Sequence, residues 1–198
     1  MWDERFSSDD YAYGKEPNDF LVEWAHSLPP GRVLSLAEGE GRNAVFLAAQ
    51  GRQVTAMDSS KVGLEKARRL AAERGVQLDT LHAELETLEP GIQQWDAVVS
   101  IFAPLAHAER RILHRKVVAA LKPGGVFLIE AYTPAQLAYG TGGGSDPDTK
   151  ITADLLREEL DGLQFLHLVE IEREVLEGRY HTGRSAVLQA VAQKPAAG

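Results

Sequence analysis

The segment Glu38–Gly41, Glu-Gly-Glu-Gly, alternates carboxylates with glycines directly after the short apolar run Val33–Leu36. The glycines allow the backbone to come close to a bound molecule. A helical pattern begins at Asn43, and the first N–H groups of a helix have no partners within it. A buried strand that turns sharply into a helix through such a loop is typical of a cofactor-binding site.

Two kinds of cofactor fit this loop. The spacing from Gly39 to Ala44 matches the Gly-x-Gly-x-x-Ala pattern of dinucleotide-binding loops, and Asp58 follows at the end of the next strand-like run, where it can bind ribose hydroxyls. However, Glu38 and Glu40 flank Gly39, and two carboxylates repel a pyrophosphate. S-adenosylmethionine carries a sulfonium, an ammonium and a ribose but no phosphate, so the carboxylates favour it. An NAD-dependent oxidoreductase remains the alternative function. For Glu40, the alternative is that its side chain faces solvent and binds no cofactor.

Strands and helices alternate around this loop, which implies right-handed βαβ units and a parallel sheet covered on both faces. The expected parallel strands are Val33–Leu36, Val54–Met57, Leu78–His82, Ala97–Ile101 and Val126–Ala131, and the helices between them are Asn43–Gln50, Ser60–Arg74 and Glu109–Leu121. An amphipathic helix, Pro17–Leu28, precedes them.

The last third of the chain has a different pattern. Thr152 is a suitable N-cap for a helix that ends at Leu160. Two further strands, Gln164–Val175 and Ala186–Ala192, are joined by the connection Glu177–Arg184, which is too short for a helical crossover and therefore predicts an antiparallel pair. The glycine-rich run from residue 140 to 144 is either a mobile flap or a passive linker, and residues 194–198 are expected to be disordered.

Composition narrows the classes of function. The chain has 198 residues, a net charge of −8 and no cysteine, which excludes disulfides and cysteine–zinc sites and disfavours nucleic acid as a partner. The basic cluster Arg110, Arg111, Arg115 and Lys116 is interpreted as a solvated helix face. The polar N-terminus of the chain and the lack of a long apolar run predict a cytoplasmic protein without membrane contact. The six histidines show no metal-ligand spacing, so no metal is expected.

Further motifs carry a resemblance to a known family. The segment Leu121–Ile129, Leu-Lys-Pro-Gly-Gly-Val-Phe-Leu-Ile, and the antiparallel terminal hairpin resemble those of class I S-adenosylmethionine-dependent methyltransferases. The segments Trp2–Phe6 and Tyr11–Asn18 are similar to a bacterial branch of tellurite-resistance and thiopurine methyltransferase-like enzymes. The resemblance implies an enzyme that transfers a methyl group to a small molecule.

The implied fold is α/β, with a doubly wound, mostly parallel seven-stranded sheet and an antiparallel C-terminal strand. It would form a single methyltransferase domain over residues 1–198. An N-terminal lid segment and helix would occupy residues 1–30, the α/β core residues 31–193 and the tail residues 194–198. The expected assembly is a monomer or a weak homodimer.

Two positions depart from the family's first motif, acid-x-Gly-x-Gly. Ser35 replaces the acid and Ala37 replaces the first glycine, whereas Glu38 supplies a carboxylate in the same turn. These departures leave open a third possibility, an inactive cofactor-binding protein with this fold.

The resemblance also implies roles for individual residues. Those assigned to the cofactor are Ser35, Ala37, Glu38, Gly39, Asp58, Ser59, Glu84, Leu85, Ser100 and Ile101. Those expected on the side of the methyl acceptor are Tyr11, Tyr13, Tyr132, His181 and Arg184. No catalytic residue is assigned, because methyl transfer needs a base only when the acceptor must lose a proton.

Overall fold

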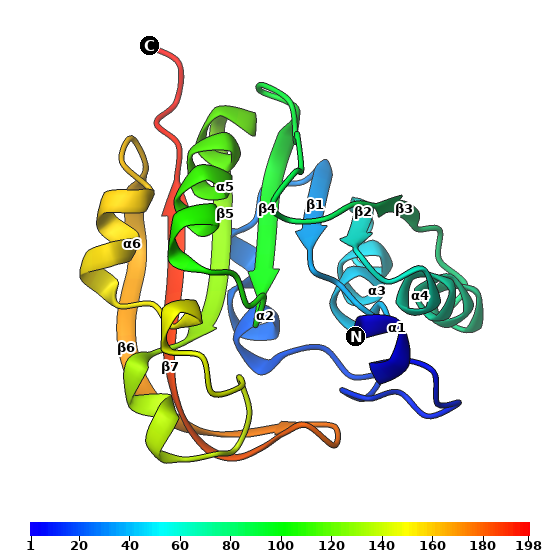
Figure 1. Ribbon diagram of the computed structural model, residues 1–198. Helices are drawn as coiled ribbons and strands as arrows, with labels where there is room; N and C mark the ends of the chain where they lie inside the picture. Colours follow the sequence, from blue (N-terminus) through cyan, green and yellow to red (C-terminus); the bar gives the residue numbers. More distant parts are fainter.

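A single seven-stranded sheet forms the centre of the computed structural model, which describes residues 1–198 (Figure 1). The strands lie in the order β3-β2-β1-β4-β5-β7-β6. Their bounds are Arg32–Leu36 (β1), Gln53–Asp58 (β2), Asp79–His82 (β3), Trp95–Ile101 (β4), Leu121–Tyr132 (β5), Gln164–Glu177 (β6) and His181–Gln193 (β7). The first five strands pair in parallel, and β7 is antiparallel to both β5 and β6. The predicted doubly wound, mostly parallel sheet is thus confirmed.

Six α-helices accompany the sheet. They are Trp2–Arg5 (α1), Asp19–Trp24 (α2), Arg42–Ala49 (α3), Lys61–Glu73 (α4), His107–Ala120 (α5) and Ala153–Glu159 (α6). Short 3₁₀ turns lie at Ala25–Ser27, Pro134–Ala138 and Pro147–Thr149. Thr152 is the N-cap of α6, as predicted, because its side-chain oxygen accepts the N–H of Leu155 at 3.2 Å. None of the helices is long and apolar enough to cross a bilayer.

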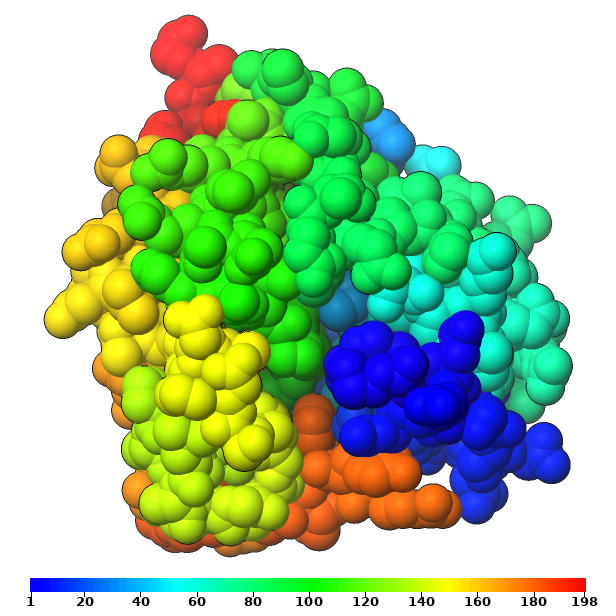
Figure 2. Space-filling model, viewed as in Figure 1, coloured from blue at the N-terminus to red at the C-terminus, as the bar shows by residue number.

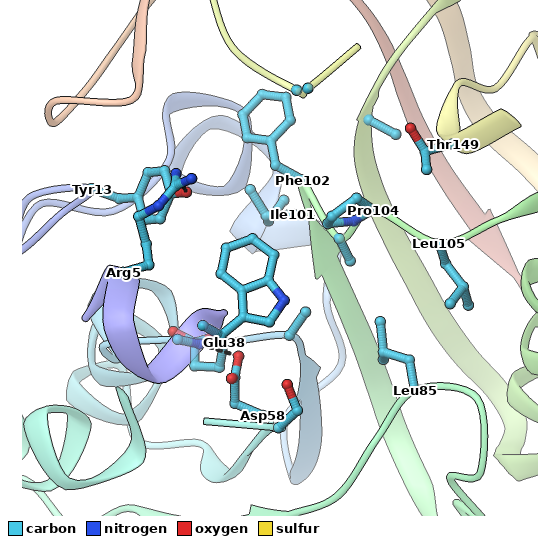
Figure 3. A pocket seen from close by; sticks show the side chains of 18 of the residues that line it. Arg5, Tyr13, Glu38, Asp58, Leu85, Ile101, Phe102, Pro104, Leu105 and Thr149 are labelled. Carbon is cyan, nitrogen blue, oxygen red and sulfur yellow. Dashed lines mark hydrogen bonds between the residues drawn. The ribbon is translucent and has the colours of Figure 1, made fainter. Parts of the chain in front are cut away.

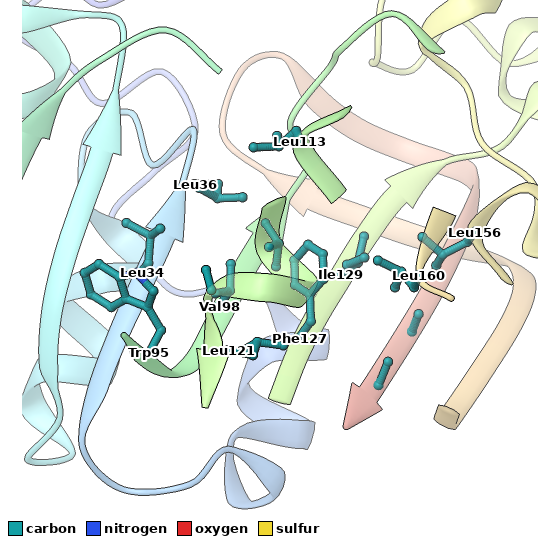
Figure 4. Close-up of a cluster of buried hydrophobic side chains, with 14 of the residues drawn as sticks. Leu34, Leu36, Trp95, Val98, Leu113, Leu121, Phe127, Ile129, Leu156 and Leu160 are labelled. Carbon is teal, nitrogen blue, oxygen red and sulfur yellow. The ribbon is translucent and has the colours of Figure 1, made fainter. Parts of the chain in front are cut away.

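The two faces of the sheet bury separate hydrophobic clusters, since neighbouring residues of a strand point to opposite faces. On one face, Leu34 of β1 packs in a cluster with Leu113 of α5 and Leu156 of α6 (Figure 4). On the other face, Val33 of β1 belongs to a cluster that also contains residues of α2, α3 and α4, among them Phe20. Burial on both faces fixes the register of the parallel strands. Because β1 to β5 run in the same direction, their carboxyl ends lie along one edge of the sheet.

The C-terminal hairpin is longer than predicted. The pairing of β6 with β7 continues to the pair Glu177 and His181, and only the three residues 178–180 connect the strands. The predicted connection Glu177–Arg184 is therefore wrong, and both His181 and Arg184 lie within β7. The hairpin extends past the rest of the sheet toward α1 (Figure 1). In this extension the alternation of apolar residues has ended, but the backbones of the two strands remain paired.

Other element boundaries also differ from the prediction. The N-terminal helix begins only at Asp19, because Asn18 caps it by accepting the N–H of Leu21 at 3.0 Å. The Pro-Gly-Gly turn forms an irregularity inside β5, because the register with β4 shifts before Val126. Helix α1 has only four residues and was not predicted from the sequence.

Arg110 does not belong to a solvated basic face. Its side chain is buried between α5 and α6, where Nε lies 3.2 Å from both carboxylate oxygens of Glu159. His114 Nδ1 lies 2.7 Å from the same carboxylate. This cluster lowers the pKa of Glu159 against the opposing effect of its burial. Arg111 and Arg115 remain exposed, so the predicted solvated face loses only its first member, Arg110.

Candidate cofactor and acceptor site

A cavity of about 560 Å³ lies at the carboxyl ends of the parallel strands. It is lined by residues that follow β1, β2, β3 and β4, by the N-terminal segment and by the loop of residues 142–150. In Figure 2 the N-terminal residues (blue) and that loop (yellow) face each other across a hollow. Ligands of open α/β sheets bind at this edge, so the fold places the cavity where the sequence predicts a site.

In the turn after β1, the side chain of Glu38 caps the N-terminus of α3. Glu38 is buried, and its Oε1 accepts the N–H groups of Asn43 at 3.1 Å and Ala44 at 2.8 Å. The hydroxyl of Ser35 donates to its other oxygen. Burial raises the pKa of Glu38, while these hydrogen bonds oppose the shift. The N–H groups that would hold a pyrophosphate in a dinucleotide-binding fold are thus already occupied by a carboxylate.

Asp58 stands at the end of β2, beside this turn. Its Oδ2 accepts the N–H of Gly39 at 2.7 Å, and its Oδ1 accepts the N–H of Ser60 at 2.8 Å. Burial raises the pKa of Asp58, and the neighbouring Glu84 adds to the shift. The side chain borders the cavity. Each carboxylate oxygen has a second lone pair, so the fixed Asp58 can still accept hydrogen bonds from two adjacent hydroxyls.

Glu40 faces neither solvent nor the cavity. It is buried, forms an ion pair with Lys66 of α4, and accepts the N–H of Ala12 at 2.8 Å. The interpretation of Glu40 as a carboxylate for a cationic cofactor is therefore wrong. Lys66, 26 positions further along the chain, neutralises Glu40 and turns it toward the N-terminal segment.

Ala37 occupies a backbone conformation that favours glycine. Its φ is +47°, in the left-handed region, where a Cβ costs roughly 1–2 kcal/mol. The residue borders the cavity. The structure thus gives a physical reason for a glycine at this position and shows that this chain tolerates the strain.

The structure brings eleven of the sequence-predicted site residues to the cavity. They are Ala37, Glu38, Gly39, Asp58, Ser59, Glu84, Leu85, Ile101, Tyr13, Tyr132 and His181. Ser35 and Ser100 lie in the strands behind the lining, and the hydroxyl of Tyr11 donates to the carbonyl of Lys66 at 3.1 Å. Arg184 is paired with Glu172 on the exposed face of the hairpin.

Four aromatic rings gather at the end of the cavity opposite the carboxylates. The Phe102 ring stacks on Tyr132 with centroids 4.5 Å apart, and His181 lies edge-on to Tyr132 at 5.5 Å and near Tyr13 at 4.6 Å. Figure 3 shows Tyr13 and Phe102 across the cavity from Asp58. Sequence reasoning missed Phe102; the available signal was an aromatic residue directly after the carboxyl end of β4. Its φ is +51°.

Two polar atoms in this aromatic cluster have no hydrogen-bond partner. The Tyr132 hydroxyl and His181 Nδ1 are buried, and their side chains belong to residues that are only 6% and 9% exposed. Burial lowers the pKa of His181 to about 4, so its ring is neutral at pH 7. Burial also raises the pKa of Tyr132, which keeps its proton. The cluster therefore offers uncharged hydrogen-bonding groups and no strong base.

The N-terminal segment covers one side of the cavity. Trp2, Arg5 and Phe6 are among the lining residues. Phe6 is 3% exposed and packs so closely on the turn after β1 that a Cβ at Gly39 would lie 3.1 Å from its ring. Lys66 Nζ donates to the carbonyls of Ser8 at 2.9 Å and Asp10 at 2.7 Å. The Glu40–Lys66 pair thus anchors the segment that the sequence predicted as a lid.

Comparison with known proteins agrees with this architecture. Residues 33–125, which contain the turn, Asp58 and the Pro-Gly-Gly segment, match the family model described as a methyltransferase domain. These residues are therefore those of a methyltransferase domain, which agrees with the family predicted from the sequence.

This methyltransferase domain is similar to enzymes of more than one kind. It is 31% identical over 112 residues to the ubiquinone biosynthesis O-methyltransferase of Rickettsia akari, with 56% of this chain and 43% of the relative covered. It is 28% identical over 134 residues to the glycine/sarcosine N-methyltransferase of Halorhodospira halochloris, with 65% and 49% covered. The chain spans less than half the length of these curated relatives.

Among solved structures, TehB from Haemophilus influenzae has a TM-score of 0.73 with 18% identity, over 98% of this chain and 65% of that one. At this identity the similarity concerns the fold of the methyltransferase domain. It extends over the N-terminal segment and the terminal hairpin as well as the residues that match the family model.

Proposed function

We propose that this protein binds S-adenosylmethionine in the cavity and transfers its methyl group to a small molecule. The observation that carries the proposal is that Asp58 is fixed beside the cavity while Glu38 already occupies the N–H groups at the start of α3. A ribose has a carboxylate to bind, whereas a pyrophosphate has no free helix N-terminus beside it. This favours a nucleoside cofactor without phosphate over the NAD alternative.

The lining residues fit such a cofactor. We assign the turn of Ala37, Glu38 and Gly39 to its methionine part and Asp58 to its ribose hydroxyls. Glu84 and Leu85, after β3, would hold the adenine, with Ser59 and Ile101 completing the lining. Ser35 would act through Glu38, to which its hydroxyl donates, and Ser100 would support the lining from within β4.

When bound, S-adenosylmethionine supplies a methyl group that is already activated by its sulfonium. The chain must then align the acceptor and exclude water, and correct orientation of reactants is worth roughly 7–11 kcal/mol. The rings of Tyr13, Phe102 and Tyr132 would exclude water at the acceptor end. A neutral His181 is a weak base there, so the site suits acceptor atoms that are nucleophilic without loss of a proton.

Isothermal titration calorimetry with S-adenosylhomocysteine, the demethylated product, tests the proposal. We expect binding at sub-millimolar concentration and none for NADH. Asp58→Ala should weaken binding roughly 10–100-fold, because hydrogen bonds to a charged group are worth about 1.5–3 kcal/mol. Asp79→Ala, which removes an exposed carboxylate at the start of the neighbouring strand β3, is the matched control and should bind like the wild type.

Two outcomes would contradict the proposal. Absence of S-adenosylhomocysteine binding to the folded wild-type protein excludes the cofactor, and tight binding of NADH restores the oxidoreductase alternative. Equal affinity of the Asp58→Ala variant and the wild type would remove Asp58 from the ribose site. Circular dichroism of the variant checks that loss of its hydrogen bonds to Gly39 and Ser60 has not unfolded the turn.

A further inference from the structure

Two of the cations that line the cavity, Arg5 and Lys150, have no anionic partner. Arg42 is paired with Glu177 at 2.6 Å, and Lys150 Nζ uses its three hydrogens on the carbonyls of Gly143 and Asp146 and the hydroxyl of Thr149. Arg5, on α1, forms no ion pair. Because the three Nζ hydrogens of Lys150 are used, Arg5 is the unpaired cation that still has N–H donors available to a ligand in the cavity.

The guanidinium of Arg5 is held in place mainly by aromatic rings. It lies over the Tyr180 ring at 4.0 Å, and its NH1 donates to the Tyr13 hydroxyl at 3.2 Å. A guanidinium has five N–H donors, and this is the one side-chain hydrogen bond that Arg5 makes. The remaining donors form a planar fork suited to two oxygens of a carboxylate. Figure 3 shows the Arg5 side chain extending beside Tyr13 at the cavity wall.

The neighbouring part of the cavity is lined by the aromatic cluster and by the glycine-rich loop. A Cβ at Gly143 would lie 2.4 Å from the Tyr132 ring, and one at Gly142 would lie 2.8 Å from the Tyr132 hydroxyl. The backbone of this loop therefore packs directly on the aromatic cluster. Because the rings of Tyr13 and Phe102 also line this part of the cavity, it suits a flat molecule that can stack on them.

We propose that this end of the cavity binds a flat aromatic acceptor that carries a carboxylate, with Arg5 as the residue that recognises the negative charge. The Tyr132 hydroxyl and His181 Nδ1, both buried without partners, hydrogen-bond a polar substituent of the same ring. The inference deepens the proposed function and rests on it, because the acceptor has to lie beside the cofactor. Arg5 is a specificity-determining residue here, and it takes no part in proton transfer.

The charge distribution supports an anionic acceptor in preference to a cationic one. Neutral His181 and protonated Tyr132 contribute no charge to this end of the cavity. Of the lining carboxylates, Glu38 and Asp58 are held by backbone N–H groups, Glu84 and Glu86 follow β3, and Asp146 lies in the same loop as the unpaired cation Lys150. An ammonium group placed beside Arg5 would be repelled. A carboxylate there would gain charge-assisted hydrogen bonds in a partly buried setting.

The probes are benzoate and benzamide, which have the same size and shape and differ in charge. Their binding is measured by ligand-detected NMR on the protein saturated with S-adenosylhomocysteine. We expect the wild type to bind benzoate at least roughly tenfold more tightly than benzamide, and Arg5→Gln to remove that preference. Arg5→Lys should keep part of it, because it retains the charge without the planar fork.

Arg179→Gln is the matched control. Arg179 lies at the tip of the same hairpin as Tyr180, but its side chain is 63% exposed and it does not line the cavity. This variant should keep the preference for benzoate. Benzoate binding no tighter than benzamide binding in the wild type, or a preference that survives in Arg5→Gln, would overturn the proposal.

Affinity for S-adenosylhomocysteine separates this inference from the proposed function. Each variant is first titrated with S-adenosylhomocysteine alone, and Arg5→Gln should bind it as the wild type does. Failure of the wild type to bind it is a failure of the proposed function. Normal binding of it without discrimination between the two probes is a failure of the acceptor inference alone.

Discussion

Replacement of Lys66 by methionine should release the N-terminal segment from the cavity. In the wild type the side chains of Lys66 and Glu40 are 6% and 3% exposed. The Lys66→Met variant leaves Glu40 buried without its counter-ion, and loss of one partner of a buried pair costs about 3–5 kcal/mol. For a chain of this size each kcal/mol corresponds to roughly 2–4 °C in Tm, so a decrease of roughly 6–20 °C is expected unless the segment detaches first.

Detachment of the N-terminal segment can be distinguished from simple destabilisation by hydrogen–deuterium exchange. Lys66 also donates to the carbonyls of Ser8 and Asp10, and opening the segment would let water reach Glu40 and these carbonyls. Hydrogen–deuterium exchange should then show loss of protection over residues 1–14, with a smaller decrease in Tm. The double variant Glu40→Gln with Lys66→Met removes the unpaired charge and should be closer to the wild type in Tm than Lys66→Met alone.

Lys15→Met is the matched control. Lys15 also pairs with a carboxylate, that of Glu73 at 2.9 Å, but both side chains are largely exposed and no measurable change is expected. The reasoning would be refuted if Lys66→Met unfolded at the wild-type Tm and its N-terminal segment kept wild-type exchange protection. That result would mean that the buried pair neither stabilises the fold nor anchors the segment.

Two further predictions concern the cavity lining. Ala37→Gly removes a left-handed Cβ beside the cofactor turn and should tighten S-adenosylhomocysteine binding in calorimetry, whereas Gln93→Gly, also at φ +47° but outside the cavity lining, should not. Because burial lowers the pKa of His181 from 6.5 to about 4, the unfolded chain binds a proton between these values that the folded protein excludes. The free energy of unfolding should fall by about 3 kcal/mol from this residue as the pH falls through that window. Urea unfolding should show this dependence lost in His181→Asn and kept in His26→Asn, a change at an exposed ring.

Local patterns in the sequence were sufficient to predict most of the fold. Each parallel strand is a short apolar run next to a turn, which is a local pattern. The cap at Thr152 likewise depends on a neighbour only three residues away. The antiparallel hairpin followed from the shortness of its connection. Its true length did not, because polar residues of β6 and β7 stay paired through their backbones after apolar alternation has ended.

Contacts between distant parts of the chain could not be predicted. The role of Glu40 depends on Lys66 of a later helix, and the burial of Arg110 depends on Glu159, which is 49 positions away. Arg5 lies in the segment Trp2–Phe6 that carries a family resemblance, but a four-residue helix has no periodicity from which its position at the cavity could be predicted. The position of Asp58 beside the cavity could be predicted, by contrast, because the end of a parallel strand is a position that the sequence itself defines.

The position of β7 inside the sheet, between β5 and β6, has a consequence for how the protein is made. The strand is formed by residues 181–193 and pairs with β5 across registers such as Val126 with Gln193. During synthesis the sheet therefore cannot close until residues 181–193 have left the ribosome, and until then β5 presents an unpaired, apolar edge. We expect incompletely synthesised chains to be the aggregation-prone species and folding to be limited by this late, long-range insertion.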